Sequence, residues 1–420
     1  MMKKKIVVVG CGFAGLPFIK TLKKDAYDIL LIDKVNHHQF QPLFYQVAAS
    51  QIEPATISFP LRRIFQKRKD VRIRLAKVES VDHTNNLIHT SIGDFSYDYL
   101  IIATGSCTNY FNNKEIEENS LSLKSTFQAM TIRNKILMSF EKLLYESDKE
   151  GLYNLVIVGG GATGVELAGA FAEMKKDVLP KDFPNILSHN VNVYLLEGSD
   201  HTLSAMSPYA QKYSEKYLVS LGVKVKTGVF VKNYDGETVT LSNDEIIRTK
   251  NVIWSAGVKG NTLKGIPEEI ILPSGRIKVN RFNNIEQLHN VYAVGDVSYM
   301  ETYKYPKGHP QLANVAIGQA KNLAKNINRI EKSPNSKLHE YEYTNLGTMA
   351  TVGRNKAVVD LPFVKFRGRF AWFIWMFLHL MLILSVRNKL VIFINWAWNY
   401  ITKNSSLRLI LADENSKHKD

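Results

Sequence analysis

Two glycine clusters are the residues of this chain whose type and spacing most clearly predict chemistry. The first, Gly10-x-Gly12-x-x-Gly15, directly follows the buried-strand pattern of residues 6–9. In such a loop the first glycine permits a tight turn, the second lets the backbone approach a pyrophosphate, and the third lets the next helix pack on the strand. Asp33 closes the next expected strand, where it could bind a ribose hydroxyl. The alternative is an ordinary glycine-rich turn, but strand, turn, helix, strand and acid in this order favour a dinucleotide site.

The same pattern occurs again in the middle of the chain. Residues 155–158 form a second β-branched run and lead into Gly159, Gly161 and Gly164. Glu197 closes the following expected strand, later than usual because an insertion at residues 177–190 intervenes. A carboxylate there would bind ribose hydroxyls and repel a 2′-phosphate, which favours NADH over NADPH. The repeat indicates an internal duplication and a second dinucleotide site.

Three further strand ends carry small or acidic residues. Two of them, Ala103-Thr104-Gly105 and Ala256-Gly257, would let the backbone pass close to a cofactor. The third strand, residues 291–294, is followed by Asp296. An aspartate there could simply cap a turn, but beside two nucleotide sites a bond to a ribitol-type hydroxyl is the better interpretation.

The bulk composition narrows the class of protein. At 420 residues the chain is expected to hold more than one domain. Its net charge of +15 is compatible with nucleic acid, an anionic membrane surface or anionic cofactors as partners. The two cysteines, Cys11 and Cys107, form no CxxC motif, so neither a redox disulfide nor a thiolate metal site is expected.

An aromatic and amide-rich stretch, residues 36–47, lacks clean periodicity and is predicted to be a loop that lines a flat ligand. A surface loop with exposed aromatic side chains is the alternative.

The C-terminal part is apolar and aromatic. Residues 370–386 carry no full charge, which is near the lower limit for crossing a bilayer of about 30 Å. In the next segment, residues 390–401, a narrow polar stripe that includes Asn395 and Asn399 runs beside apolar residues. We expect helices that lie in a membrane interface, with tryptophans and flanking cations as anchors. A helix pair buried against protein is the alternative, and a hairpin across the bilayer is less favoured. The flanking cations are Lys365, Arg367, Arg369, Arg387, Lys389, Lys403 and Arg408.

Two dinucleotide sites on one chain predict electron transfer between a resident flavin and an exchangeable nicotinamide. Without a cysteine pair to take the electrons, disulfide reductases and sulfide-oxidising flavoproteins are disfavoured. A tail at the membrane favours a lipid-soluble acceptor, a quinone.

Over essentially its whole length the sequence resembles the type II NADH:quinone oxidoreductases. These are single-subunit, non-proton-pumping NADH dehydrogenases of the two-dinucleotide-binding-domain flavoprotein superfamily. The aromatic stretch and the tail carry the most specific part of the resemblance. The matching segments are residues 37–48, 103–106, 159–169, 293–296, 346–354 and 371–398.

The resemblance implies cofactor contacts for named positions. Glu166 matches the family's glutamate at the junction of nicotinamide and flavin, where it would orient the nicotinamide or handle protons. The residues expected to bind FAD are Gly10, Gly12, Phe13, Ala14, Gly15, Asp33, Lys34, Val78, Ala103, Thr104, Gly105, Asp296, Ala316 and Ile317. Those expected to bind NADH are Gly159, Gly161, Ala162, Thr163, Gly164, Glu166, Glu197, Ala256 and Gly257.

The quinone pocket is expected to include Tyr45, Gln46, Asn314, Gly318 and Gln319. Here the chain departs from the family's usual Ala-Gln-x-Ala-x-Gln, because a shorter amide and a glycine replace the two glutamines. We expect this change to enlarge the pocket or to alter quinone preference.

The expected fold is α/β, with two Rossmann-like domains, the second inserted into the first, and a C-terminal amphipathic helical segment that anchors the chain to the membrane. The expected parts are residues 1–120 and 261–364 for FAD, 121–260 for NADH, and 365–420 for membrane association.

The expected activity is FAD-dependent electron transfer from NADH to a membrane quinone, at the cytoplasmic face of the cell membrane. An NADH oxidase or diaphorase that uses oxygen or a soluble acceptor, and a membrane-tethered redox sensor, are the alternatives. Nucleic acid is not expected as a partner, and a homodimer stays open.

Overall fold

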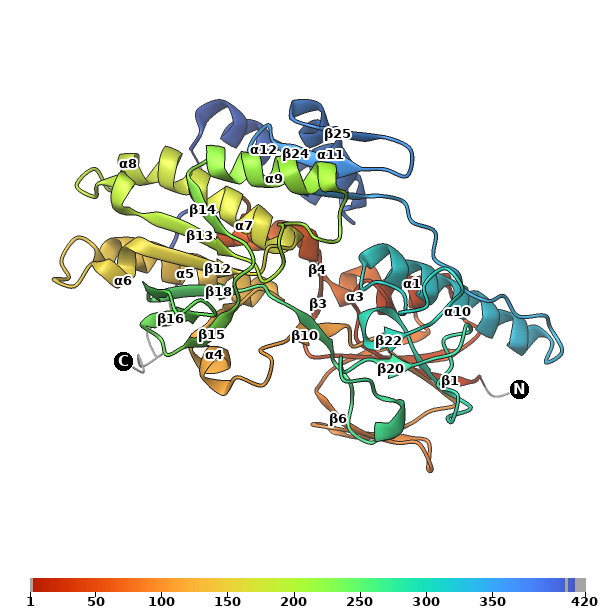
Figure 1. The fold of residues 1–420 in the computed structure, drawn as a ribbon. Coiled ribbons are helices and arrows are strands. Elements are labelled where there is room, and N and C mark those ends of the chain that lie inside the picture. The colour runs from red at the N-terminus through yellow and green to blue at the C-terminus, as the bar shows by residue number, and fades with distance from the viewer. Residues whose placement is uncertain (1–2, 405–406, 412–420) are drawn as a thin grey trace. The chain divides into compact units, whose positions relative to one another are not determined.

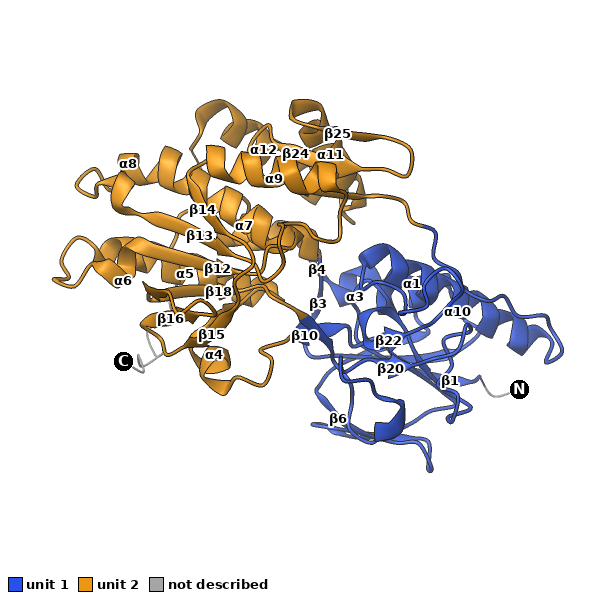
Figure 2. Ribbon diagram, in the orientation of Figure 1, with its two compact units in different colours: residues 1–39, 59–107, 258–344 blue, residues 40–58, 108–257, 345–420 orange. Residues whose placement is uncertain are grey.

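The computed structural model describes residues 3–404 and 407–411. The chain divides into two compact units, each built from three separate segments (Figure 2). Unit 1 comprises Met1–Gln39, Phe59–Cys107 and Val258–Thr344, and unit 2 comprises Phe40–Ser58, Thr108–Gly257 and Asn345–Asp420. The four-part division expected from the sequence differs from this, because residues 40–58, 108–120 and 345–364 belong to unit 2 and residues 258–260 belong to unit 1. Its assignment of functions to domains stays a prediction.

Unit 1 is built on a five-stranded parallel sheet in the order β21-β9-β1-β2-β5. Its central strand β1 and the helices α1 and α10 are labelled in Figure 1. Alternate residues of the central strand β1 bury on opposite faces, as the pleat requires. Ile6 and Val8 lie in a cluster with α1 and α10, and Val7 and Val9 lie in a second cluster on the other face. The bounds are β1 (Lys5–Val9), β2 (Asp28–Asp33), β5 (Val71–Leu75), β9 (Tyr99–Ile102), β21 (Val291–Ala293), α1 (Gly15–Thr21) and α10 (Ala313–Lys332).

Shorter elements complete unit 1. A three-stranded antiparallel sheet is formed by β6 (Val78–Asp82), β7 (Leu87–Thr90) and β8 (Gly93–Ser96). The remaining elements, two of which extend by one residue into unit 2, are β3 (His37–Gln39), β4 (Ser58–Pro60), α3 (Leu61–Ile64), β10 (Ser106–Thr108), β19 (Val258–Gly260), β20 (Ile277–Lys278) and β22 (Ser298–Tyr299).

Unit 2 contains a second five-stranded parallel sheet, in the order β11-β18-β12-β13-β14. Two parallel Rossmann-like sheets are therefore present, which confirms the predicted α/β class. The bounds are β11 (Leu121–Ser122), β12 (Asn154–Val158), β13 (Asn192–Leu196), β14 (Val223–Lys226), β18 (Asn251–Trp254), α4 (Lys114–Asn119), α5 (Thr126–Lys142), α6 (Glu150–Tyr153), α7 (Ala162–Glu173), α8 (Leu179–Asp182) and α9 (Pro208–Ser220). An antiparallel sheet adds β15 (Val231–Tyr234), β16 (Thr238–Leu241) and β17 (Ile246–Arg248).

The C-terminal segment of unit 2 begins with an antiparallel sheet of β23 (Thr348–Thr351), β24 (Ala357–Asp360) and β25 (Lys365–Arg367). Two helices follow, α11 (Arg369–Leu382) and α12 (Val386–Thr402). Ala371 of α11 packs against Ala357 and Val359, so the helix shares a core with the sheet. None of the described helices is long and apolar enough to cross a membrane.

The polar stripe of α12 faces the protein. Asn388 donates from Nδ2 to the Thr56 carbonyl at 2.9 Å, and Asn399 donates to the Gln51 carbonyl at 2.9 Å. The opposite faces of α11 and α12 present large apolar side chains to the surface. They are Phe370, Phe373, Phe377, Leu378, Met381, Leu382, Leu390, Phe393, Ile394, Trp398 and Ile401.

The prediction of a loop at residues 36–47 was wrong. The stretch forms β3, a 3₁₀ turn at Gln41–Leu43 and the start of the helix α2 (Phe44–Ala48). Phe40, Leu43, Phe44 and Val47 are all buried. The free energy gained by burying each of these side chains is larger than the differences in secondary-structure propensity between residues. Burial therefore decides the structure of this stretch although its periodicity is weak.

Candidate functional site

The first glycine loop has the packing that a dinucleotide loop requires. Gly10 adopts φ +96°, and a Cβ there would overlap the carbonyl oxygen of Ala103. Gly15 packs directly on the Gly10 carbonyl, whereas Gly12 has no heavy atom within 4 Å of the position of a Cβ. The loop is therefore closed on the protein side and open at its middle glycine. Asp33 accepts from the Cys11 N–H at 2.7 Å, so this carboxylate also braces the loop.

Other residues expected at FAD gather around this loop within unit 1. A Cβ on Gly295 would lie 3.2 Å from the Cβ atoms of Ala14 and Ala316, so three segments meet there. Asp296 accepts from the Ser106 hydroxyl at 2.8 Å. The buried hydroxyl of Thr104 has no hydrogen-bond partner among the described residues. An open loop and an unpaired buried donor fit a bound FAD.

Of the remaining expected residues, Val78 is buried at the start of β6 and Lys34 is exposed after β2.

Helix α10 begins without a side-chain cap. The Ala316 N–H donates to the Leu312 carbonyl at 3.0 Å, so the N–H groups without a partner in the helix belong to residues 313–315. The anion-attracting end of the helix lies slightly before Ala316 and Ile317, the residues named from the sequence. Their contact with the flavin stays a prediction.

The positions where the chain departs from the family's glutamine pattern also lie in unit 1. Gly318 leaves no empty space, because a Cβ there would collide with the hydroxyl of Tyr341. The predicted effect of this change on the quinone pocket or on quinone preference stays a prediction. Gln319 is wholly buried and accepts through Oε1 from the Gly295 N–H at 2.8 Å. Asn314 is exposed on the first turn of α10.

The second glycine loop repeats the geometry of the first within unit 2. Gly159 adopts φ +107° against Ala256, Gly164 packs on the Gly159 carbonyl, and Gly161 has open space at the position of a Cβ. Glu197 braces the loop as Asp33 does, since its Oε2 accepts from the Gly160 N–H. The small strand-end residues Ala103 and Ala256 thus make room for the glycine turns themselves.

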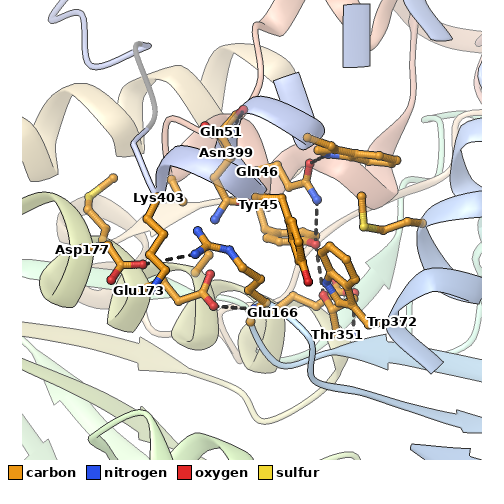
Figure 3. A pocket seen from close by; sticks show the side chains of 18 of the residues that line it. Tyr45, Gln46, Gln51, Glu166, Glu173, Asp177, Thr351, Trp372, Asn399 and Lys403 are labelled. Atoms are coloured by element: carbon orange, nitrogen blue, oxygen red, sulfur yellow. Dashed lines mark hydrogen bonds and ion pairs between the residues drawn. The ribbon is translucent and has the colours of Figure 1, made fainter. Parts of the chain in front are cut away.

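A pocket in unit 2 encloses about 810 Å³, open solvent at its mouth included. Its polar side comes from α7 and the π-helical turn Met174–Val178 that follows, and its aromatic side comes from α11 and α12. Figure 3 shows the acids along one side of the pocket and Tyr45 and Gln46 of α2 facing it. The lining includes Tyr45, Gln46, Glu166, Glu173, Asp177, Thr351, Arg354, Trp372, Trp375, Trp396, Tyr400 and Lys403.

Glu166 is a buried acid in the wall of this pocket, and its pKa is strongly perturbed. It lies in the second turn of α7 with a side chain only 9% exposed. Burial raises the pKa of its carboxyl to about 8, because the charged form loses solvation. Two hydrogen bonds from Thr351 oppose this increase, one of them from the backbone N–H at 3.4 Å. A carboxyl with such a pKa can hold or release a proton near neutral pH.

A second acid occupies the same side of the pocket two helical turns later. Glu173 accepts from the Arg354 N–H, and burial raises the pKa of its carboxyl. Asp177 lies 3.5 Å from the Arg354 guanidinium. Gly169 explains how both contacts form, because a Cβ there would lie 2.8 Å from the Gly353 nitrogen. Helix α7 can approach the end of β23 this closely only through a glycine.

Comparison with protein families gives two matches that together span most of the chain. Residues 4–320 match the pyridine nucleotide-disulphide oxidoreductase family, and residues 345–403 match the NDH2 C-terminal domain. The type II NADH:quinone oxidoreductase Ndh of Mycobacterium tuberculosis is 32% identical, over 98% of this chain and 91% of that protein. The chain belongs to the type II NADH:quinone oxidoreductases.

Further relatives agree with this family. The internal alternative NAD(P)H-ubiquinone oxidoreductase A1 of Arabidopsis thaliana is 28% identical, over 95% of this chain and 84% of that protein. A solved structure of NDH2 from Plasmodium falciparum in complex with NADH has the same fold, with a TM-score of 0.90 at 20% identity, and covers 98% of this chain and 100% of that chain. Membership in the pyridine nucleotide-disulphide oxidoreductases implies binding of FAD and NAD. In this type II oxidoreductase the two cysteines are both free.

The residues expected at the quinone are divided between the units of this type II oxidoreductase. Tyr45 and Gln46 line the pocket with Glu166, whereas Asn314, Gly318 and Gln319 belong to unit 1. Sequence reasoning missed Thr351 and Trp396, which take part in the hydrogen bonds of the pocket. Both lie in segments that resemble the family, but nothing in their sequence neighbourhood marks them as partners of Glu166 or Gln46.

Gly169→Ala is expected to lower quinone turnover about tenfold and to destabilise the fold by about 1–3 kcal/mol, because the added methyl separates α7 from β23. Denaturant unfolding and steady-state kinetics measure the two effects. Gly151→Ala on α6 is the matched control, since its nearest neighbour is the flexible Lys250 side chain. Equal behaviour of the two variants would show that the close approach is unimportant.

Proposed function

We propose that this chain oxidises NADH and passes two electrons to a membrane quinone, and that Glu166 handles the proton that the reaction takes up. Family membership establishes the class of activity. The observation that supports the role of Glu166 is its strongly perturbed carboxyl in a pocket lined by aromatic side chains. FAD, when bound, accepts a hydride from NADH and passes two electrons on.

The overall reaction converts NADH, a proton and a quinone to NAD⁺ and a quinol, so each turnover takes up a proton. Glu166 is suited to supply it, because its carboxyl is protonated below about pH 8 and lies on the wall of the pocket. Tyr45 and Gln46 would orient the quinone headgroup. Asn314, Gly318 and Gln319 remain proposed contributors from unit 1.

For the cofactors, we propose that the loop from Gly10 to Gly15, with Asp33, Thr104 and Asp296, holds FAD. The loop from Gly159 to Gly164, with Glu197, Ala256 and Gly257, would hold NADH. The carboxylate of Glu197 favours NADH, since it would repel the extra phosphate of NADPH. Open middle glycines in both loops and the unpaired Thr104 hydroxyl support this assignment.

For the membrane, we propose that the apolar faces of α11 and α12 lie in the interface of the cytoplasmic leaflet, with basic residues at their ends. The exposed phenylalanines and Trp398 support this role. Two of the expected anchors are already engaged within unit 2. The Arg367 guanidinium lies over the Tyr213 ring and Arg408 pairs with Asp182.

NADH consumption by the purified protein, measured with menaquinone or ubiquinone analogues and with oxygen alone, tests the proposal. We expect strong stimulation by a quinone in detergent. Turnover with oxygen alone, unchanged by quinone, would instead favour the NADH oxidase. Negligible flavin bleaching by NADH within seconds would favour a redox sensor.

A further inference from the structure

A chain of hydrogen bonds joins the tail helix α12 to Glu166 within unit 2. Trp396 donates from Nε1 to Gln46 Oε1 at 2.7 Å, and Gln46 Nε2 donates to the Tyr45 hydroxyl at 2.9 Å. The Tyr45 hydroxyl lies 3.0 Å from Thr351 Oγ1. The Thr351 backbone N–H donates to Glu166 Oε1 at 3.4 Å, and the Thr351 side chain also lowers the pKa of the Glu166 carboxyl. Figure 3 shows Gln46, Tyr45, Thr351 and Glu166 in this order.

Trp396 sets the direction of the first two hydrogen bonds of the chain. An indole N–H can only donate, so Gln46 must present its oxygen to Trp396 and its NH₂ group to Tyr45. The oxygen of Tyr45 then accepts from Gln46. Between Tyr45 and Thr351 either hydroxyl can donate, and donation by Tyr45 is the arrangement that gives its single proton an acceptor in the chain. The Thr351 oxygen accepts that proton, and its own proton remains for the carboxylate of Glu166. In this arrangement every proton of the chain has an acceptor.

Every link of the chain is shielded from solvent. Trp396 is 7% exposed, Gln46 and Tyr45 are 6% exposed, and Thr351 is 3% exposed. Hydrogen bonds in such surroundings are electrostatically stronger than in water, and a missing partner is costly. The packing of Tyr45 edge-on to Trp375, with ring centroids 6.3 Å apart, further fixes the direction of its hydroxyl.

Other titratable groups face the pocket from the neighbouring elements. They are Tyr45 on α2, Glu173 and Asp177 on α7 and the turn after it, Arg354 after β23, Tyr400 on α12 and Lys403 at the end of that helix. Burial raises the pKa of the Tyr45 phenol, which therefore stays neutral. For Glu166 itself, burial raises the pKa of the carboxyl and the two bonds from Thr351 lower it. Thr351 is thus the residue that most lowers the pKa of Glu166 against the effect of burial.

We propose that Thr351 is a positioning residue for Glu166, and that Trp396 of the tail helix keeps the Thr351 hydroxyl proton directed at the Glu166 carboxylate through Gln46 and Tyr45. This proposal rests on the proposed function of Glu166. It makes α12 part of the device that sets the proton affinity of the acid.

Thr351→Val tests the proposal, because valine keeps the shape of threonine and removes its hydroxyl. We expect the titration midpoint of the Glu166 carboxyl to rise by about one to two pH units, since the charged form loses a donor. The midpoint is measured on the flavin-loaded enzyme without substrate, as the infrared C=O band of the protonated carboxyl that is lost in Glu166→Gln. The pH profile of quinone turnover should shift in the same direction.

Two further variants keep the test decisive if valine prevents folding. Thr351→Ser restores the hydroxyl and should return the midpoint to that of the wild type. Trp396→Phe keeps an aromatic ring and removes the donor, so the midpoint should rise by a smaller amount. Trp398→Phe, on the exposed side of the same helix, is the matched control and should not move it.

The outcomes separate the two levels of the proposal. Normal quinone turnover by Glu166→Gln would overturn the proposed role of Glu166 in proton handling. A slow Glu166→Gln enzyme together with a wild-type midpoint in Thr351→Val would overturn the positioning role alone. A midpoint that shifts equally in Trp396→Phe and Trp398→Phe would overturn the part assigned to Trp396.

Discussion

Glu166→Gln is expected to lower quinone-dependent turnover about 100-fold while leaving FAD content and flavin bleaching by NADH close to those of the wild type. The size follows from the usual contribution of a positioned proton donor. Glutamine keeps the shape of the protonated acid and cannot give up a proton. Stopped-flow absorbance separates the reductive step from reoxidation by quinone. Glu141→Gln, an exposed acid on α5, is the matched control.

The pH dependence of quinone turnover provides a second test of the role of Glu166. Because burial raises the pKa of Glu166 to about 8, wild-type turnover should fall as the pH rises through about 8, and the variant should lack this decrease. Stability follows the same linkage. Between pH 4.5, the ordinary pKa of the group, and about pH 8 the carboxyl of Glu166 binds more protons in the folded than in the unfolded state. The contribution of Glu166 to the free energy of unfolding therefore falls as the pH rises through this range. Unchanged kinetics and an unchanged profile in Glu166→Gln would contradict the assigned role.

Loss of apolar side chains from the exposed face of α11 and α12 is expected to weaken membrane binding at least about 100-fold. The test is the triple variant Phe377→Ser, Phe393→Ser and Ile394→Ser, whose side chains are 61%, 57% and 62% exposed. Each side chain contributes about 1–2 kcal/mol when it enters the interface. Co-sedimentation with phosphatidylglycerol vesicles measures the effect, and NADH oxidation with ferricyanide should persist.

Phe127→Ser serves as the control for this variant, because Phe127 is 77% exposed on α5, away from the two tail helices in the sequence. It should leave vesicle binding unchanged. Equal loss in both variants, or full binding by the triple variant, would show that the two helices do not anchor the chain.

The glycine loops could be predicted from the sequence because their geometry is local. Gly10 and Gly159 are each followed by the rest of their motif within a few residues, and each packs against a strand end of its own sheet. The acids Asp33 and Glu197 were expected to contact ribose, and the structure adds that they brace the loops. The cofactor contacts themselves remain predictions.

The pocket could not be predicted in the same way, because its contacts join distant segments. Thr351 and Glu166 are 185 residues apart, and Trp396 and Gln46 are 350 residues apart. No pattern within a helix or strand encodes such pairs. The polar stripe of α12 was visible in the sequence, but its partners, the carbonyls of Gln51 and Thr56, lie more than 300 residues earlier in the chain, and nothing in the stripe itself points to them.

The measurement that tests the central claim most directly is anaerobic reoxidation of the NADH-reduced enzyme. The enzyme is reduced with one equivalent of NADH and then mixed with a short-chain quinone in a stopped-flow instrument. We predict that flavin absorbance recovers at a rate that rises with quinone concentration and reaches at least the steady-state turnover rate. Recovery only on admission of oxygen, with no effect of quinone, would contradict the assignment.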